Sequence, residues 1–164
     1  MHKIILCGLI GAATTALIFA AEEASKSAAP ATEHHVLNPA DLKWADGPPG
    51  LPAGDKMAVL NGDPGQAGPF TVRLKAPAGY KVMPHTHPTA ERVTLISGKM
   101  KVGMGDKFEK EALQELQPGG YVVMPAGMAH FVKIGAESIV QIDSDGPFQI
   151  NYVNPSDDPR NAKK

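Results

Sequence analysis

The sequence predicts an all-β protein, a sandwich or small barrel built from short strands. Among its 164 residues are 17 Gly and 15 Pro, which favour frequent turns over long helices. Residues 70–77 (FTVRLKAP) alternate in polarity and place Phe70, Val72 and Leu74 on one face, as in a half-buried strand. The later segments repeat this texture of short apolar stretches between Gly/Pro turns, which is typical of sandwiches and barrels.

The other expected strands follow in chain order. They cover residues 81–87, 91–98, 99–105, 120–127, 130–135, 138–143 and 148–153. Only residues 109–116 (EKEALQEL) suggest a helical turn, and they are too few to change the fold class. Trp44 and Met57 are expected to fill the core, because large apolar side chains are usually buried.

Residues 1–21 have the features of a secretory signal peptide. Lys3 precedes an apolar stretch over 4–21, and charge returns abruptly at Glu22. An uncleaved membrane anchor is the alternative, since the stretch is about as long as a bilayer requires. The only cysteine, Cys7, lies inside this segment, so the exported protein would contain no disulfide. The expected location is the periplasm or the outside of the cell, with no membrane attachment after cleavage.

The rest of the chain is expected to form one domain. Residues 22–39 are a polar, unpatterned arm whose His34 and His35 are expected to be solvated. Residues 40–153 form the β domain, and 154–164 form a polar tail that is expected to fray. The formal net charge of −1 gives no electrostatic signal for nucleic acid as a partner.

Histidines and one glutamate form a pattern that suits a metal ion. His85 and His87 are two residues apart, so on a strand they share a face. Glu91 follows across the short turn PTA and could join them, and His130 is the remaining histidine of the domain. Imidazole and carboxylate together suit divalent transition metals. An H-x-H pair alone is a weak signal, so the residues around it matter.

These residues closely resemble the two motifs of the cupin superfamily. The fixed positions of the first motif are matched by Gly79, His85, His87, Glu91 and Gly98. Those of the second are matched by Gly119, Pro125, Gly127 and His130, whereas Ile134 stands where asparagine is common. The glycines of both motifs, and Gly105, are expected at turns that need a positive φ.

The resemblance implies a fold and a metal site. It implies a cupin double-stranded β-helix, a small jelly-roll-like barrel, that binds one divalent transition-metal ion through His85, His87, Glu91 and His130. Zn, Cu, Mn, Fe and Ni all accept such ligands, and the sequence leaves the choice open.

Candidate substrate contacts are mainly apolar. Met83, Leu95 and Met124 are expected to line the cup, and Arg73 could clamp a carboxylate or enolate, although strand arginines more often face water. No general acid or base is identified beside the metal ligands.

Two functions follow from this interpretation. The first is a metal-dependent, dioxygenase-like enzyme that acts on a small oxygen-rich molecule, as the resemblance to cupin dioxygenases implies. The second is a non-enzymatic periplasmic protein that binds a metal or a small molecule, because one fold carries many functions. Pairing into a homodimer is also expected from the resemblance.

Overall fold

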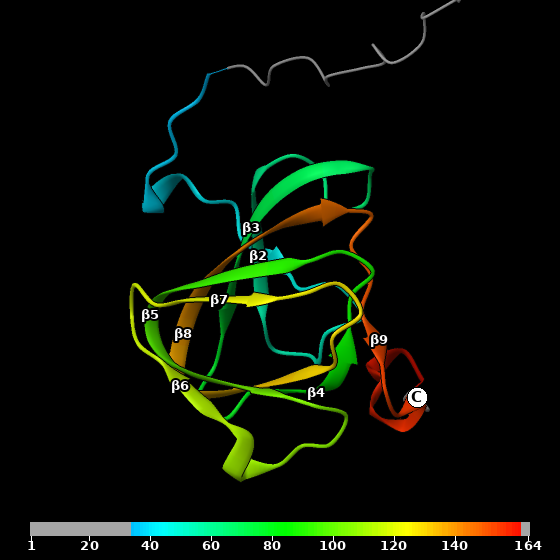
Figure 1. Ribbon diagram of the computed structural model, residues 1–164. Helices are drawn as coiled ribbons and strands as arrows, with labels where there is room; N and C mark the ends of the chain where they lie inside the picture. The colour runs from blue at the N-terminus through cyan, green and yellow to red at the C-terminus, as the bar shows by residue number, and fades with distance from the viewer. Residues whose placement is uncertain (1–33, 162–164) are drawn as a thin grey trace, which may run out of the picture. The chain divides into compact units, whose positions relative to one another are not determined.

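The computed structural model describes residues 34–161 (Figure 1). The predicted signal peptide and most of the predicted arm lie outside these residues. Within the described part, no helix is long and apolar enough to cross a membrane.

The described residues form nine strands and four short 3-10 turns. The strands are β1 (Ala45–Asp46), β2 (Lys56–Asn61), β3 (Gly68–Ala76), β4 (Lys81–Thr86), β5 (Glu91–Met104), β6 (Gln114–Leu116), β7 (Tyr121–Met124), β8 (His130–Gly146) and β9 (Asn151–Tyr152). The 3-10 turns are Pro39–Asp41, Lys110–Ala112, Pro155–Asp157 and Pro159–Asn161. The all-β prediction is confirmed.

All strand pairs are antiparallel, and two long strands organise the sheet. One path of neighbours runs β1-β2-β3-β8-β4-β9, and β5 pairs with β6, β7 and β8. Because β5 and β8 each pair with several partners along their length, the sheet curls around a common interior (Figure 1). The core lies in this interior and includes Phe70, Val93 and Ile142.

The long strands correct the expected segmentation. Residues 91–98 and 99–105 belong to one strand, β5, and 130–135 and 138–143 belong to β8. The pairing shifts register around Gly98, whose φ is 95°. A Cβ at Gly98 would collide with the Glu137 carbonyl, so this glycine allows a bulge where a turn was expected.

Three smaller expectations also change. The segment 109–116 contains one 3-10 turn and then β6. Trp44 is half-buried and lies outside the core cluster, whereas Met57 packs against that cluster. Residues 154–161 are not frayed, because the Arg160 guanidinium donates to the Ile150 carbonyl at 2.7 Å and to Asp158.

Candidate metal centre

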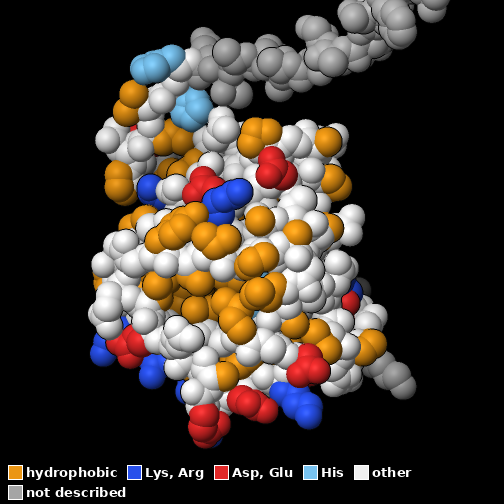
Figure 2. Space-filling model, in the orientation of Figure 1, with side chains coloured by type: hydrophobic (Ala, Val, Ile, Leu, Met, Phe, Trp, Pro, Cys, Tyr) orange, Lys and Arg blue, Asp and Glu red, His pale blue; other side chains and the backbone are white. Residues whose placement is uncertain are grey.

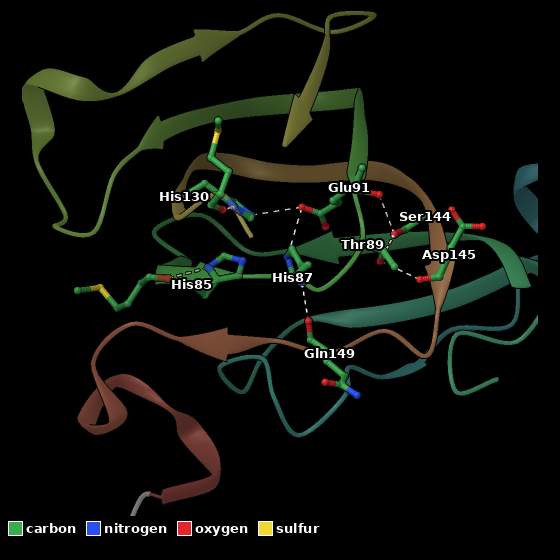
Figure 3. Close-up of polar contacts among 11 residues, drawn as sticks. His85, His87, Thr89, Glu91, His130, Ser144, Asp145 and Gln149 are labelled. Carbon is green, nitrogen blue, oxygen red and sulfur yellow. Dashed lines mark hydrogen bonds and ion pairs between the residues drawn. The ribbon is translucent and has the colours of Figure 1, made fainter. Parts of the chain in front are cut away.

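Four side chains, three from strands and one from the turn after β4, meet inside the barrel (Figure 3). His85 in β4 lies directly opposite His130 in β8, because the two residues are partners in the strand register. His87 follows the end of β4, and Glu91 is the first residue of β5. All four are buried, with exposed fractions of 4% for His85, 3% for His87, 6% for Glu91 and 1% for His130.

The four side-chain tips are close together. The ligand atoms of the three histidines lie within 4.8 Å of one another. A Glu91 carboxylate oxygen is 3.4 Å from His130 Nε2 and 3.6 Å from His87 Nε2. The three imidazoles therefore form the compact group, and Glu91 adjoins it beside His87 and His130.

Backbone carbonyls hold all three imidazoles by the same ring nitrogen. The Nδ1–H of His85 donates to the Met83 carbonyl at 2.7 Å, and that of His130 to the Met128 carbonyl at 3.1 Å. The Nδ1–H of His87 donates to the Gln149 carbonyl at 2.7 Å. A carbonyl only accepts, so each Nδ1 carries the proton and each Nε2 keeps a lone pair. This tautomer is the one that a metal ligand needs.

Burial favours the neutral form of the His85 and His87 imidazoles. It lowers the pKa of His85 to about 3, and the neighbouring His130 and His87 lower it further. Burial also lowers the pKa of His87. For Glu91, burial raises the pKa, but the neighbouring His130, His87 and His85 outweigh it, and the net pKa is lowered. The site therefore combines three imidazoles, two of which burial keeps neutral, with one carboxylate.

The residues fit a divalent cation. Within the described residues, the buried Nε2 atoms of His87 and His130 have no hydrogen-bond partner. Each faces an acceptor, the Glu91 carboxylate, so lone pairs point at lone pairs. A cation among them would accept these lone pairs and pair with the carboxylate, as buried charges usually require. His85, His87, Glu91 and His130 are the residues that would hold it.

A small hydroxyl network fixes the turn that carries Glu91. The Ser144 hydroxyl donates to the Ala90 carbonyl at 2.9 Å, and the Thr89 hydroxyl donates to the Asp145 carbonyl at 2.9 Å. The two hydroxyl oxygens are 3.1 Å apart. These contacts bind the turn before Glu91 to β8, the strand that carries His130 (Figure 3).

The metal centre opens into a cavity of about 70 Å³. Its walls are mostly aliphatic, and Phe148 stacks on the His87 ring with centroids 4.6 Å apart. The polar residues among its lining are few. They are Asp55, Tyr80 and the four ligand residues.

The four predicted substrate contacts lie in different places. Met124 lines the cavity. Leu95 is fully buried in the core, and Met83 supplies the carbonyl that holds His85, but neither is among the residues that line the cavity. Arg73 lies on the strand face opposite Val72, where its guanidinium is 3.4 Å from the Gln141 side-chain oxygen. It does not contribute to the cavity lining.

Sequence reasoning missed one polar residue of the cavity, Asp55. It is 4% exposed and lines the wall. Asp55 lies in a stretch of Gly and Pro (GPPGLPAGD) that has no periodicity, so no signal in the sequence marked the side chain as buried.

Comparisons with known proteins identify a family and several relatives. The model of a family described as "Domain of unknown function (DUF4437)" matches residues 19–151. Germin-like protein 9-3 from Oryza sativa subsp. japonica is 40% identical over 68 residues, which cover 41% of this chain and 31% of that protein. The match thus spans about a third of the length of this curated relative.

Solved structures share the fold. The polyketide cyclase RemF from Streptomyces resistomycificus gives a TM-score of 0.64 at 18% identity, covering 78% of this chain and 91% of that one. An acetylacetone dioxygenase from Acinetobacter johnsonii gives a TM-score of 0.60 at 20% identity, covering 82% of this chain and 87% of that one. A further neighbour is described as an RmlC-like cupin. The chain therefore belongs to the DUF4437 family, and its fold resembles that of a structure described as a cupin.

Proposed function

We propose that this protein is an exported, metal-dependent enzyme of the dioxygenase type that acts on a small oxygen-rich molecule. One observation carries the proposal: three imidazoles, each held by a backbone carbonyl, and the Glu91 carboxylate converge at the wall of an apolar cavity. Four protein ligands leave coordination positions free on an ion that prefers five or six, which is typical of catalytic sites.

The residues of the site have separable tasks. A bound divalent ion would act as a Lewis acid toward an oxygen-bearing substrate. His85, His87 and His130 orient lone pairs into the site, and Glu91 neutralises part of the cation's charge. The aliphatic walls and Phe148 exclude water, which strengthens electrostatic interactions inside the cavity.

The cavity favours a small substrate. Its volume of about 70 Å³ corresponds to on the order of five to seven water-sized positions. A β-diketone is near that size, whereas a flavonol is several times larger. The structural likeness to proteins named acetylacetone dioxygenase is consistent with a β-diketone, although at 20–22% identity it supports the fold alone.

Oxygen consumption with a defined probe tests the proposal. Purified protein is analysed for Zn, Cu, Mn, Fe and Ni, loaded with each metal, and supplied with acetylacetone while dissolved oxygen is recorded. We expect oxygen uptake with at least one metal and none with His85→Ala. Metal binding without oxygen uptake from acetylacetone or other small diketones would favour the alternative, a non-enzymatic metal- or small-molecule-binding protein.

Export and pairing are parts of the same proposal. The basic start and apolar stretch of residues 1–21 support a cleaved signal peptide. Cell fractionation, with mass spectrometry of the mature N-terminus, tests it.

Hydrophobic side chains gather on one face of the molecule (Figure 2), and Ile96 of β5 and Tyr121 and Val123 of β7 are exposed. Such a patch supports a homodimer, which light scattering would detect.

A further inference from the structure

Asp55 is a buried acidic residue in the cavity wall, outside the metal centre. It ends a loop, residues 47–55, that contributes two side chains to the cavity, those of Leu51 and Asp55. The same two residues also line an outer pocket formed mainly by this loop. They therefore stand between the interior of the barrel and the surface.

The loop is held in place by two tyrosines from the barrel. The Tyr80 hydroxyl donates to the Pro52 carbonyl at 2.6 Å, and the Tyr152 hydroxyl donates to the Gly50 carbonyl at 2.9 Å. Each hydroxyl has one proton, and each proton is used in these bonds. The tyrosines thus fix the loop that carries Asp55. The Tyr80 hydroxyl also lies beside the Asp55 carboxyl group, where it lowers the pKa of that group against the larger effect of burial.

One oxygen of Asp55 lacks a partner. Its Oδ2 is buried and makes no hydrogen bond with the described part of the protein. A buried polar atom without a partner costs about 1–3 kcal/mol, so such atoms usually serve a purpose. Gly47 makes room for this oxygen, because a Cβ at that position would collide with the carboxyl group.

The chemistry of Asp55 suits a hydroxyl group. Burial raises the pKa of Asp55, which brings its neutral form closer to physiological pH. A protonated carboxyl donates to a hydroxyl oxygen, and an ionised one accepts from a hydroxyl proton. A hydroxyl is therefore a good partner in both protonation states, whereas a methyl group leaves Oδ2 unpaired.

We propose that Asp55 binds a hydroxyl group of the cavity's ligand that the metal does not hold, and so selects hydroxylated small molecules. This inference rests on the proposed function, because it requires a ligand beside the metal centre. Asp55 and the four ligand residues line the same cavity, so a ligand that fills it can contact both. Among the described residues, Asp55 and Tyr80 are the only other polar side chains in its walls, and the Tyr80 hydroxyl donates to the Pro52 carbonyl.

Two probes that differ by one hydroxyl test the inference. Lactate and glycerate chelate a metal through the same carboxylate and 2-hydroxyl groups, and glycerate carries a second hydroxyl where lactate has a methyl group. Both are titrated by calorimetry, as matched D and L pairs, into protein loaded with Zn, which is redox-inert. We expect the wild type to prefer glycerate by about tenfold, the value of one well-made hydrogen bond.

Variants assign that preference to Asp55. Asp55→Ala should bind glycerate and lactate about equally while its Zn content is unchanged. Asp55→Asn, which still hydrogen-bonds, should keep most of the preference for glycerate. Asp46→Ala is the control, because Asp46 is an exposed acid paired with Lys56 at 2.6 Å. Should Asp55→Ala fail to fold, Asp55→Leu, which is nearly the same shape, replaces it.

The outcomes separate this inference from the proposed function. Equal binding of the two acids by the wild type, or a preference that survives in Asp55→Ala, would overturn the role of Asp55 alone. Failure of the wild type to bind either acid would also overturn it, while oxygen uptake with acetylacetone would still uphold the enzyme. A preference that Asp55→Ala removes supports the inference whether or not oxygen is consumed.

Discussion

The chain contains two close pairs of histidines with opposite surroundings. His85 and His87 are buried and lie with His130 and Glu91 in the barrel. His34 and His35 are exposed, at the surface where Figure 2 shows pale blue side chains, and His35 Nε2 lies 3.0 Å from the Leu60 carbonyl. Adjacent histidines on an irregular segment do not share a face, whereas alternate histidines on a strand do. Burial and a fixed Nδ1 distinguish the candidate ligands.

Removing ligands from the two pairs should give the largest difference. We expect His85→Ala, His87→Ala and His130→Ala each to lower metal affinity by more than about 100-fold, since losing a ligand should exceed the 10–100-fold effects typical of its supporting partners. His34→Ala and His35→Ala should leave metal content unchanged. Elemental analysis after dialysis against a weak chelator measures both. Equal losses from the two pairs would place the metal elsewhere.

The next-largest difference between the two histidine pairs is expected in the acid sensitivity of the metal-free protein's stability. The pKa of His85 is lowered from 6.5 to about 3 in the folded state, so below pH 6.5 the unfolded chain binds a proton that the folded chain does not. Stability therefore rises with pH in this range and falls on acidification, by up to about 1.4 kcal/mol per pH unit from this residue.

Urea unfolding between pH 4.5 and 6.5 measures this slope. We expect His85→Asn to flatten it, because the variant removes the group that the folded state keeps neutral. His34→Ala should retain the slope of the wild type. A His85→Asn slope as steep as that of the wild type would mean that other groups cause the acid sensitivity.

The sequence predicted the residues that follow a repeating rule. Period-two alternation placed His85 beside His87. The positive φ expected at five glycines is found at Gly79, Gly98, Gly105, Gly119 and Gly127, although Gly98 lies at a bulge and not at a turn. The same alternation put Arg73 opposite Val72, which favoured the water-facing alternative that the sequence left open for Arg73.

Features that depend on contacts between distant segments of the chain could not be predicted from the sequence. The bulge at Gly98 depends on the pairing of β5 with β8, which lie about forty residues apart in the chain, so two strands looked like four. The loop that carries Asp55 is held by Tyr80, just before β4, and by Tyr152 in β9, through bonds to loop carbonyls. The anchors of the imidazoles are also main-chain carbonyls, whose positions no side-chain pattern encodes.

The smallest predicted effect tests whether the hydrogen bonds that hold the metal ligands raise metal affinity beyond what burial alone provides. Because the Nδ1 acceptors are carbonyls, substitution does not remove them, and the hydroxyl network before Glu91 is the support that mutation can reach. We expect Ser144→Ala to cost about 1 kcal/mol of unfolding free energy and to lower metal affinity several-fold, because the turn carrying Glu91 loses its bond to β8.

Ser138→Ala is the matched control for Ser144→Ala. Ser138 is also a buried serine of β8, and its hydroxyl donates to the Ala136 carbonyl at 2.7 Å, but it supports the bulge at Gly98 and no metal ligand. The two variants should lose similar stability, measured by urea unfolding, whereas only Ser144→Ala should weaken metal binding in a competition with a chromogenic chelator. If both variants weaken it equally, general loosening of β8 explains the effect, and the turn before Glu91 has no special role.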